Sequence, residues 1–288
     1  MLVFEKLRYF ILLPLILLTL LTTPKPVDTD TAVFASQKVY VMEQALAMGQ
    51  GITTDGEYFY TSGAATGLHV TYLGKIEIAS MAMVAKHLNP LPEVCKKRGN
   101  NHIGGISYYN GKIYASVEGG GVCNACIVVY DPETLTATGE VYDLPNEIYD
   151  DGIPWLAVEP DTGYLYASQW NHAEVVNVYD VNDGMRFVKA ITPTGIGELH
   201  RIQGGEFHNG TLYLSQDSHD NGTRKYLLAM DVSTGEVTVA AERDVNNDNM
   251  EAEGMTFLMK DGTPSLYVLD YNKAVGIFLR EYRIPALN

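Results

Sequence analysis

The sequence predicts an all-β fold: a β-propeller of five blades, each made of four antiparallel strands, with six blades as the alternative. The first observation is a recurring hairpin, whose clearest copy is GGISYYNGKIYAS at residues 104–116. One hairpin cannot bury both of its faces alone, so the copies are expected to pack on one another. The turn of each copy contains a glycine, namely Gly56, Gly111, Gly163, Gly210 and Gly262. Successive glycines are 55, 52, 47 and 52 residues apart, a spacing typical of propeller arrays.

The second observation is another hairpin that follows the first at a fixed lag. It reads IVVYDPETLTATG at 127–139, VNVYDVNDGMRFV at 176–188 and LLAMDVSTGEVTV at 227–239. Its Asp favours a turn, because the carboxylate can accept hydrogen bonds from backbone amides two residues on. Two hairpins in each period give the four strands of one blade. A β-sandwich gives no reason for such a two-hairpin repeat and is the less favoured fold.

The first 35 residues are interpreted as a signal peptide. Lys6 and Arg8 precede an apolar run at residues 9–21 that is short for a membrane span, and Val33 and Ala35 match the small residues of a cleavage site. This interpretation predicts a secreted or extracytoplasmic protein, with residues 36–288 forming a single propeller domain. An uncleaved membrane anchor is the alternative, because the cleavage site lies far beyond the apolar run.

The strand at the start of this domain is predicted to close the ring. Residues 37–47 begin as a strand with no hairpin partner, and the last repeat supplies only three strands. Adding the N-terminal strand to the last blade removes two exposed sheet edges. The blades then span approximately 48–97, 98–148, 149–197, 198–247, and 248–288 with 37–47. A sixth blade would need a hidden hairpin in residues 76–92, which read equally well as an outer strand followed by a helical or irregular loop.

Charge and composition narrow the class of partner. The chain has a formal net charge of −15, 27 glycines and 19 tyrosines. Nothing in it could neutralise a row of phosphates, so nucleic acid is excluded as a partner, and no membrane contact is expected after signal cleavage. A small molecule or another polar ligand is the expected partner.

Candidate functional residues stand before the strands that line the central channel of a propeller. The alignment on the glycines of these strands puts six residues at odd offsets, namely Gln50, Asn100, His102, His200, Glu251 and Glu253. Alternating side chains would point these six to one side, into the channel mouth. His102 and His200 are the candidate catalytic residues. The candidate metal ligands are Glu253, Glu251, His102, His200 and Asp151, and the same end of the channel receives Glu118, Trp170, His172, Asp217 and Asp270.

These side chains are of the types that hold a divalent cation. Oxygen ligands suit Ca²⁺, whereas histidine shifts the preference toward Zn²⁺ or Mn²⁺. The histidines can equally act as a general acid and base. Two acidic groups held close together repel, so the pKa of Glu251 or Glu253 is expected to be raised in the absence of a metal. The alternative is a purely structural role, in which these polar side chains cap the ends of strands and line a channel that contains water.

One motif resembles a known family. Glu253-Gly254-Met255-Thr256, followed by a turn and a tyrosine-rich strand, resembles the channel-strand opening of the SMP-30/gluconolactonase and strictosidine-synthase-like propellers. Asp151-Gly152-Ile153 is similar to the Asp-Gly opening of the same group. The resemblance implies a metal-binding role for Glu253 and a lactonase-type activity. Those propellers have six blades, whereas five repeats are present here.

Two functions are therefore expected at the channel mouth. The first is a metal-assisted hydrolase or lactonase that acts on a small molecule. The alternative is a non-enzymatic binding module for a sugar, a peptide or a partner protein, because aromatic rings suit such surfaces. Its candidate anchors are Trp155, Trp170, Tyr149 and Tyr271.

Three cysteines complete the set of predicted features. Cys123 and Cys126 stand in the loop after the second strand of the second blade, and Cys95 stands at the blade junction just before it. Both loops are expected at the same end of the propeller. An exported protein favours disulfides, so Cys95 is expected to bond to Cys123 or Cys126 and to leave one free thiol.

Overall fold

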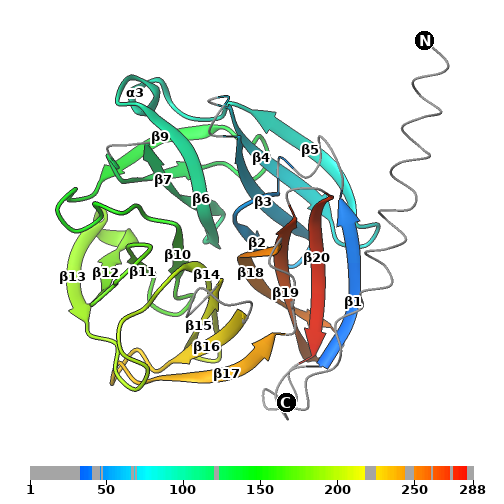
Figure 1. Cartoon of the computed structure of the whole chain (residues 1–288). Coiled ribbons are helices and arrows are strands. Elements are labelled where there is room, and N and C mark those ends of the chain that lie inside the picture. The colour runs from blue at the N-terminus through cyan, green and yellow to red at the C-terminus, as the bar shows by residue number, and fades with distance from the viewer. Residues whose placement is uncertain are drawn as a thin grey trace.

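The computed structural model confirms a five-bladed β-propeller, in which five four-stranded antiparallel sheets follow one another around a ring (Figure 1). It describes residues 33–283 except 41–45, 47, 66, 67, 69, 120–122, 218–224, 244–249, 261, 273 and 274. Residues 1–32 of the expected signal peptide lie outside this range. No helix in the described ranges is long and apolar enough to cross a membrane.

The first three blades run in chain order from the innermost strand outward. The first blade consists of β2 (Ile52–Thr54), β3 (Tyr58–Ala65), β4 (Val70–Glu77) and β5 (Ala82–Leu88), and is followed by the short helix α3 (Glu93–Lys97). The second consists of β6 (Asn100–Tyr109), β7 (Lys112–Gly119), β8 (Cys126–Tyr130) and β9 (Ala137–Asp143). The third consists of β10 (Trp155–Val158), β11 (Tyr164–Ser168), β12 (Val176–Asp180) and β13 (Arg186–Ile191), with the single-turn helix η2 (Val181–Asp183) after β12.

The last two blades complete the ring. The fourth consists of β14 (Ile202–His208), β15 (Thr211–Gln216), β16 (Lys225–Met230) and β17 (Val237–Arg243). The fifth consists of β18 (Met250–Lys260), β19 (Thr263–Asn272), β20 (Gly276–Arg283) and β1 (Val33–Tyr40). Residues 76–92, the region considered for a sixth blade, form the end of β4, the whole of β5 and the residues before α3. They contain no additional hairpin.

The repeated turn residues have the backbone geometry that a tight hairpin requires. Gly111 and Gly210 have φ angles of 75° and 77°, and the preceding Asn110 and Asn209 have φ angles of 48° and 49°. Two successive residues with positive φ define the hairpin turn whose twist matches that of the flanking strands, and Asn-Gly is its preferred sequence. The recurring Asn-Gly pair therefore fixes the register of these hairpins.

The N-terminal strand closes the ring as predicted, but it spans an earlier part of the sequence than expected. β1 pairs antiparallel with β20 as the outermost strand of the last blade. It begins at Val33 and ends at Tyr40, whereas residues 37–47 were expected. Cleavage after Ala35 would remove Val33 and Phe34, which pair with Arg283 and Tyr282.

The innermost strands of neighbouring blades contact one another around the channel, namely β2, β6, β10, β14 and β18. Glycine permits this close approach. A Cβ added to Gly254 would lie 2.7 Å from the Cα of Gly51, and one added to Gly204 would lie 2.8 Å from the Cα of Gly254. Any side chain at these positions would force the blades apart. The repeated glycines therefore set the spacing of the ring and bring the loops at its two ends together.

Candidate metal centre at the channel mouth

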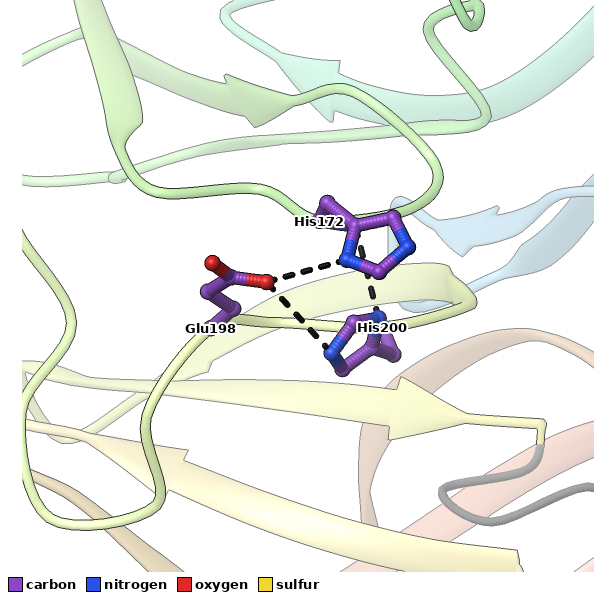
Figure 2. A group of neighbouring side chains, drawn as sticks. All are labelled: His172, Glu198 and His200. Atoms are coloured by element: carbon purple, nitrogen blue, oxygen red, sulfur yellow. Dashed lines mark hydrogen bonds and ion pairs between the residues drawn. The ribbon is translucent and has the colours of Figure 1, made fainter.

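Three potential metal ligands converge at the end of the channel where the innermost strands begin. The Nδ1 atom of His172 lies 3.0 Å from Oε2 of Glu198, and the Nε2 atom of His200 lies 3.7 Å from the same oxygen (Figure 2). One potential ligand atom from each of the three residues lies within 4.8 Å of the others. Within the described part of the chain, this is the one group of three His, Cys, Asp or Glu side chains that meets this criterion.

A short bridge between two loops builds this cluster. Ala173, in the loop after β11, pairs antiparallel with Leu199, in the segment before β14. Their reciprocal backbone hydrogen bonds measure 3.0 and 3.1 Å. Both side chains are buried, so the neighbouring residues on each segment turn the opposite way. This alternation presents His172 beside Glu198 and His200.

The cluster is partly open to solvent. The exposed fraction of the side chain is 76% for His172, 44% for Glu198 and 26% for His200. The two imidazole rings meet edge to face, with centroids 4.6 Å apart. His172, a member of the cluster, and Arg201, which follows His200, have φ angles of 49° and 50°, a region that residues other than glycine rarely occupy. The positive φ angles of these two residues cost free energy, and the contacts of the surrounding loops therefore have to offset that cost.

His102 and Asp151 make contacts of their own nearby. The Nδ1 atom of His102 lies 3.0 Å from Oε1 of Glu118, and the second oxygen of Glu118 accepts a hydrogen bond of 2.5 Å from the backbone N–H of Ile153. Asp151 accepts a hydrogen bond of 3.1 Å from the backbone N–H of Asn171, the residue before His172. Asp151 therefore supports the loop that carries the cluster, and His102 is oriented by a carboxylate on β7.

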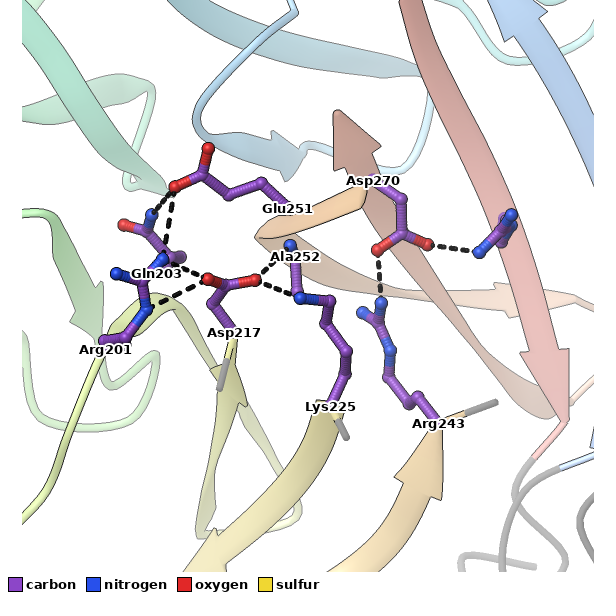
Figure 3. Close-up of polar contacts among 9 residues, drawn as sticks. Arg201, Gln203, Asp217, Lys225, Arg243, Glu251, Ala252 and Asp270 are labelled. Atoms are coloured by element: carbon purple, nitrogen blue, oxygen red, sulfur yellow. Dashed lines mark hydrogen bonds and ion pairs between the residues drawn. The ribbon is translucent and has the colours of Figure 1, made fainter. Parts of the chain in front are cut away.

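Glu251 belongs to a network of charged side chains at the mouth (Figure 3). Its Oε1 atom lies 3.6 Å from a guanidinium nitrogen of Arg201 and accepts a hydrogen bond of 3.3 Å from Gln203. Arg201 also pairs with Asp217, whose other oxygen accepts a hydrogen bond of 2.5 Å from Lys225. Burial alone would raise the pKa of Asp217, but Lys225, Arg201 and the backbone N–H of Ala252 together outweigh it, so this pKa lies below its usual value. The network therefore holds Asp217 as an anion.

Glu253 is buried, with a residue exposure of 1%. Among the residues that the structure describes, neither of its carboxyl oxygens has a hydrogen-bond partner. Burial raises the pKa of Glu253 well above its usual value, and the nearby charges of Glu251 and Asp217 raise it further. A raised pKa was expected for one of the two glutamates from mutual repulsion, whereas at Glu253 the main cause is burial and the charge of Glu251 contributes less. Without a cation beside it, this group favours the protonated acid.

The predicted ligands are therefore distributed over several contacts. His200 belongs to the converging cluster, His102 pairs with Glu118, and Glu251 joins the Arg201 network. His172 was expected at this end of the channel but not as a ligand, and Glu198 was not among the expected residues. The alternation in Glu198-Leu199-His200 was the available signal, because residues two apart share one side of an extended segment.

Two of the four aromatic anchors proposed for a binding module are not available. Trp155 and Tyr149 are fully buried. The indole N–H of Trp155 donates a hydrogen bond of 2.9 Å to Ser168, and the hydroxyl of Tyr149 lies 3.0 Å from that of Tyr179. Both rings pack within the core. Trp170 remains at the mouth, with the guanidinium carbon of Arg201 4.8 Å from the centroid of its ring system.

Comparisons with known proteins place the fold but no family. No protein-family model matches the chain, and no curated protein matches it in sequence. Similar solved structures include the native Bacillus subtilis arabinanase, with 17% identity and a TM-score of 0.53 over 88% of this chain and 97% of that one. The GH43_1 enzyme from Xanthomonas citri, complexed with xylose, has 15% identity and a TM-score of 0.53 over 88% of this chain and 90% of that one.

A third similar structure is the tail fibre of a Staphylococcus aureus phage, with 15% identity and a TM-score of 0.54 over 88% of this chain. The chain spans about half of that protein, because the match covers 52% of its length. All three likenesses concern the propeller fold. The resemblance to the SMP-30/gluconolactonase group therefore extends only to the propeller architecture, because no family model matches the chain.

Proposed function

We propose that this protein is a metal-assisted hydrolase that acts on a small molecule at the channel mouth, with His172, Glu198 and His200 as the ligands of a divalent cation. The observation that carries the proposal is the convergence of their ligand atoms within 4.8 Å. Two imidazoles and one carboxylate from two loops supply the donors for one ion. The glycoside hydrolases among the similar folds support a hydrolase in general terms.

The donor set favours zinc over calcium. Ca²⁺ takes six to eight oxygen ligands, whereas catalytic zinc sites use three protein ligands, including the combination of two histidines and one glutamate, and leave a fourth position for water or substrate. Mn²⁺ is the second choice, since it accepts both imidazole and carboxylate. The exposure of His172 leaves room for a ligand that the protein does not supply.

The surrounding residues provide the remaining functions of a hydrolytic site. A bound cation would polarise a carbonyl or activate water. Arg201, next in sequence to His200, has a side chain that is 31% exposed, and its charge can bind a substrate oxygen that becomes negative during the reaction. The pairing with Asp217 and the contact with Trp170 hold its guanidinium group in position.

Glu253 offers a second position for a cation, and the lactonase-type resemblance rests on it. Both of its oxygens are buried without a hydrogen-bond partner in the described part of the chain, and a cation beside them would favour the carboxylate form. Within the described residues, however, Glu253 belongs to no group of three converging ligands. The His172 cluster is therefore the preferred site, and a lactone is one candidate among the ester-like substrates.

A non-enzymatic binding module is the second candidate function. The observation that favours it is the contact between Trp170 and Arg201, which presents an aromatic ring and a cation at the same mouth. Aromatic rings with nearby polar groups suit sugars and peptides. A xylose complex exists for one of the similar propellers, which makes a pentose the first sugar to try.

Metal titration separates the two functions. Protein freed of metal with a chelator and titrated with Zn²⁺ by calorimetry is expected to bind one ion, and Glu198→Gln should weaken binding by at least about tenfold. Glu147→Gln, which removes an exposed carboxylate elsewhere, serves as the matched control and should leave the affinity unchanged. Zinc-dependent hydrolysis of a panel of esters and lactones would then support the hydrolase. Absence of stoichiometric zinc binding, or equal affinity in both variants, would overturn it.

A further inference from the structure

A second candidate site lies at the opposite end of the central channel. A cavity of about 590 Å³ opens there between residues from all five blades. The residues that line the cavity lie in the later half of an innermost strand or just after its end. Glu198 and His200 of the His172 cluster instead lie just before β14 begins. Its volume falls in the range of small-molecule sites. The cavity is therefore separate from the channel mouth.

Glu206 on β14 supplies a carboxyl group to the wall of this cavity. It lines the cavity, and its Oε1 atom accepts a hydrogen bond of 3.0 Å from the backbone N–H of Phe207. Its Oε2 atom accepts a hydrogen bond of 3.2 Å from the hydroxyl of Thr256. Both donors are neutral. No Lys, Arg or His lines the cavity among the described residues, so no lining side chain balances the charge of Glu206.

The pKa of Glu206 reflects this lack of a counter-charge. Burial raises it to about 7, and the hydrogen bonds from Phe207 and Thr256 offset this effect only in part. A cationic ligand would stabilise the ionised form.

Asp55 adds a second carboxyl group to the cavity, and both of its oxygens already accept hydrogen bonds. It lines the cavity at the end of β2. Its Oδ1 atom accepts hydrogen bonds of 2.8 Å from the backbone N–H groups of Glu57 and Tyr58, and its Oδ2 atom accepts one of 2.7 Å from the hydroxyl of Tyr60. Two carboxyl groups and no lining cation make the cavity unfavourable for phosphates and carboxylates.

Aromatic side chains form much of the remaining wall. The lining includes Tyr108, Tyr109, Phe207 and Phe257. Neighbouring rings fix two of them: Phe207 has its centroid 5.0 Å from that of Tyr166, and Phe257 has its centroid 5.2 Å from that of Tyr213. The faces of aromatic rings attract cations, and aromatic cages recognise quaternary ammonium groups.

We propose that this cavity binds a small organic cation, an amine or a quaternary ammonium compound, with Glu206 as its counter-ion and the aromatic wall around its alkyl groups. A metal ion fits less well, because the oxygens of Asp55 are already engaged and Ca²⁺ needs six to eight oxygen ligands. A neutral sugar fits less well, because it would leave the charge of Glu206 unbalanced. The proposal is independent of the metal centre at the mouth.

Calorimetry with choline and a neutral analogue of the same shape tests the proposal. At pH 8 the wild-type protein is expected to bind choline at least tenfold more tightly than 3,3-dimethylbutan-1-ol, in which carbon replaces the charged nitrogen. Glu206→Gln should weaken choline binding by at least tenfold and leave the affinity for the alcohol unchanged. Glu147→Gln, which removes a carboxylate outside the cavity, should bind choline as the wild type does.

A pH series and a second variant keep the test decisive. Choline affinity should rise from pH 6 to pH 8 in the wild type, because only ionised Glu206 attracts the cation, and this rise should be absent in Glu206→Gln. The other titratable groups that line the cavity are Asp55, Tyr108 and Tyr109. Phe257→Leu keeps the wall apolar and should also weaken choline binding. Failure of choline, tetramethylammonium and butylamine all to bind, equal binding of the neutral alcohol, or tighter binding of xylose would overturn the proposal.

Discussion

Glu251 and Glu253 lie two residues apart on β18, yet only Glu253 is sealed from solvent. The side chain of Glu251 is 28% exposed and contacts Arg201. Glu253 has a residue exposure of 1% and, within the described ranges, no hydrogen-bond partner. The β18–β19 register shifts between Ala252 and Met255, which places a local irregularity at this point. The same strand thus carries one carboxyl group that is paired with an arginine and one that is buried without a partner among the described residues.

The first prediction concerns the pH dependence of stability. The folded-state pKa of Glu253 is raised well above 4.5, chiefly by burial. The unfolded chain therefore releases its proton first as pH rises, and the stability associated with this group falls from about pH 4.5 upward until the folded-state pKa is reached. Glu253→Gln should match the wild type near pH 4 and exceed it at pH 7, with the difference growing by up to about 1.4 kcal/mol per pH unit.

Urea unfolding of both proteins between pH 4 and pH 8 measures this difference. Glu147→Gln is the control, since it removes an exposed carboxylate, and its stability should follow that of the wild type across the range. A Glu253→Gln variant that is less stable than the wild type at pH 7 would show that the carboxylate is ionised in the fold, and would point to an undetected cation beside it.

The second prediction concerns the buried charges of the last two blades. Asp270 is fully buried and pairs with Arg243 (Figure 3). It also pairs with Arg280. The side chains of Arg243 and Arg280 are 2% and 6% exposed. Removing one partner of a buried ion pair leaves uncompensated charge and costs about 3–5 kcal/mol. Asp270→Asn should therefore lose stability of this order in urea unfolding.

An exposed ion pair supplies the matched control for that change. Arg186 and Asp183 are 55% and 64% exposed, and exposed pairs contribute about 0–1 kcal/mol. Asp183→Asn should thus be nearly neutral. Similar losses in Asp270→Asn and Asp183→Asn would mean that the Asp270 cluster is hydrated and contributes little.

The fold was predictable because its strongest local signals repeat. Asn110-Gly111 and Asn209-Gly210 specify tight turns from local backbone preferences alone, so the hairpins and their spacing follow from sequence. The limits of β1 were not predictable in this way. Its pairing with β20, nearly the whole chain away, decides that Val33 is included, and no local signal reports that contact.

The candidate site was less predictable because it lies in loops outside the repeat. Ala173 and Leu199 bring His172 to Glu198 through a bridge between two blades, and the repeat alignment contains no trace of this pairing. His200 was found because it stands at a repeated position before an innermost strand. The charge partners of Glu251 depend likewise on the approach of Arg201 and Gln203 from the neighbouring blade.

The third prediction concerns ring closure. A chain that begins at residue 41 lacks β1, so β20 becomes an exposed edge strand, and aggregation or a loss of several kcal/mol is expected. A chain that begins at Val33 keeps the whole strand and should retain the stability of the full chain. Thermal unfolding and size-exclusion chromatography report both properties. A chain that starts at residue 41, stays monomeric and melts at an unchanged temperature would contradict closure by β1.

An intermediate truncation tests the proposed cleavage site as well. A chain that begins at Ser36 loses Phe34, whose ring lies edge to face with Tyr282 at a centroid distance of 6.0 Å. Such contacts contribute about 0.5–1.5 kcal/mol, so this chain should be slightly less stable than the one that begins at Val33. Mass spectrometry of the mature N-terminus would show which form an expressing cell produces.

The last prediction concerns the cysteines. Cys95 and Cys126 are both fully buried, and their Sγ atoms lie 3.9 Å apart as free thiols. Cys123 is partly exposed, and its thiol donates a hydrogen bond of 2.9 Å to the backbone carbonyl of Asp150. If the protein is exported to an oxidising compartment, Cys95 and Cys126 should form the disulfide, which closes a loop between residues 31 apart and should add about 3 kcal/mol of stability.

Thiol titration of denatured, unreduced protein should therefore find one free thiol, and peptide mapping should assign it to Cys123. Cys123→Ser should leave no free thiol and an unchanged melting temperature, because this side chain lies outside the core pair. Cys126→Ser should leave two free thiols and a less stable protein. Three free thiols in the exported wild type, or a mapped bond that includes Cys123, would contradict the pairing, since Cys95 lies in the same buried cluster as Cys126.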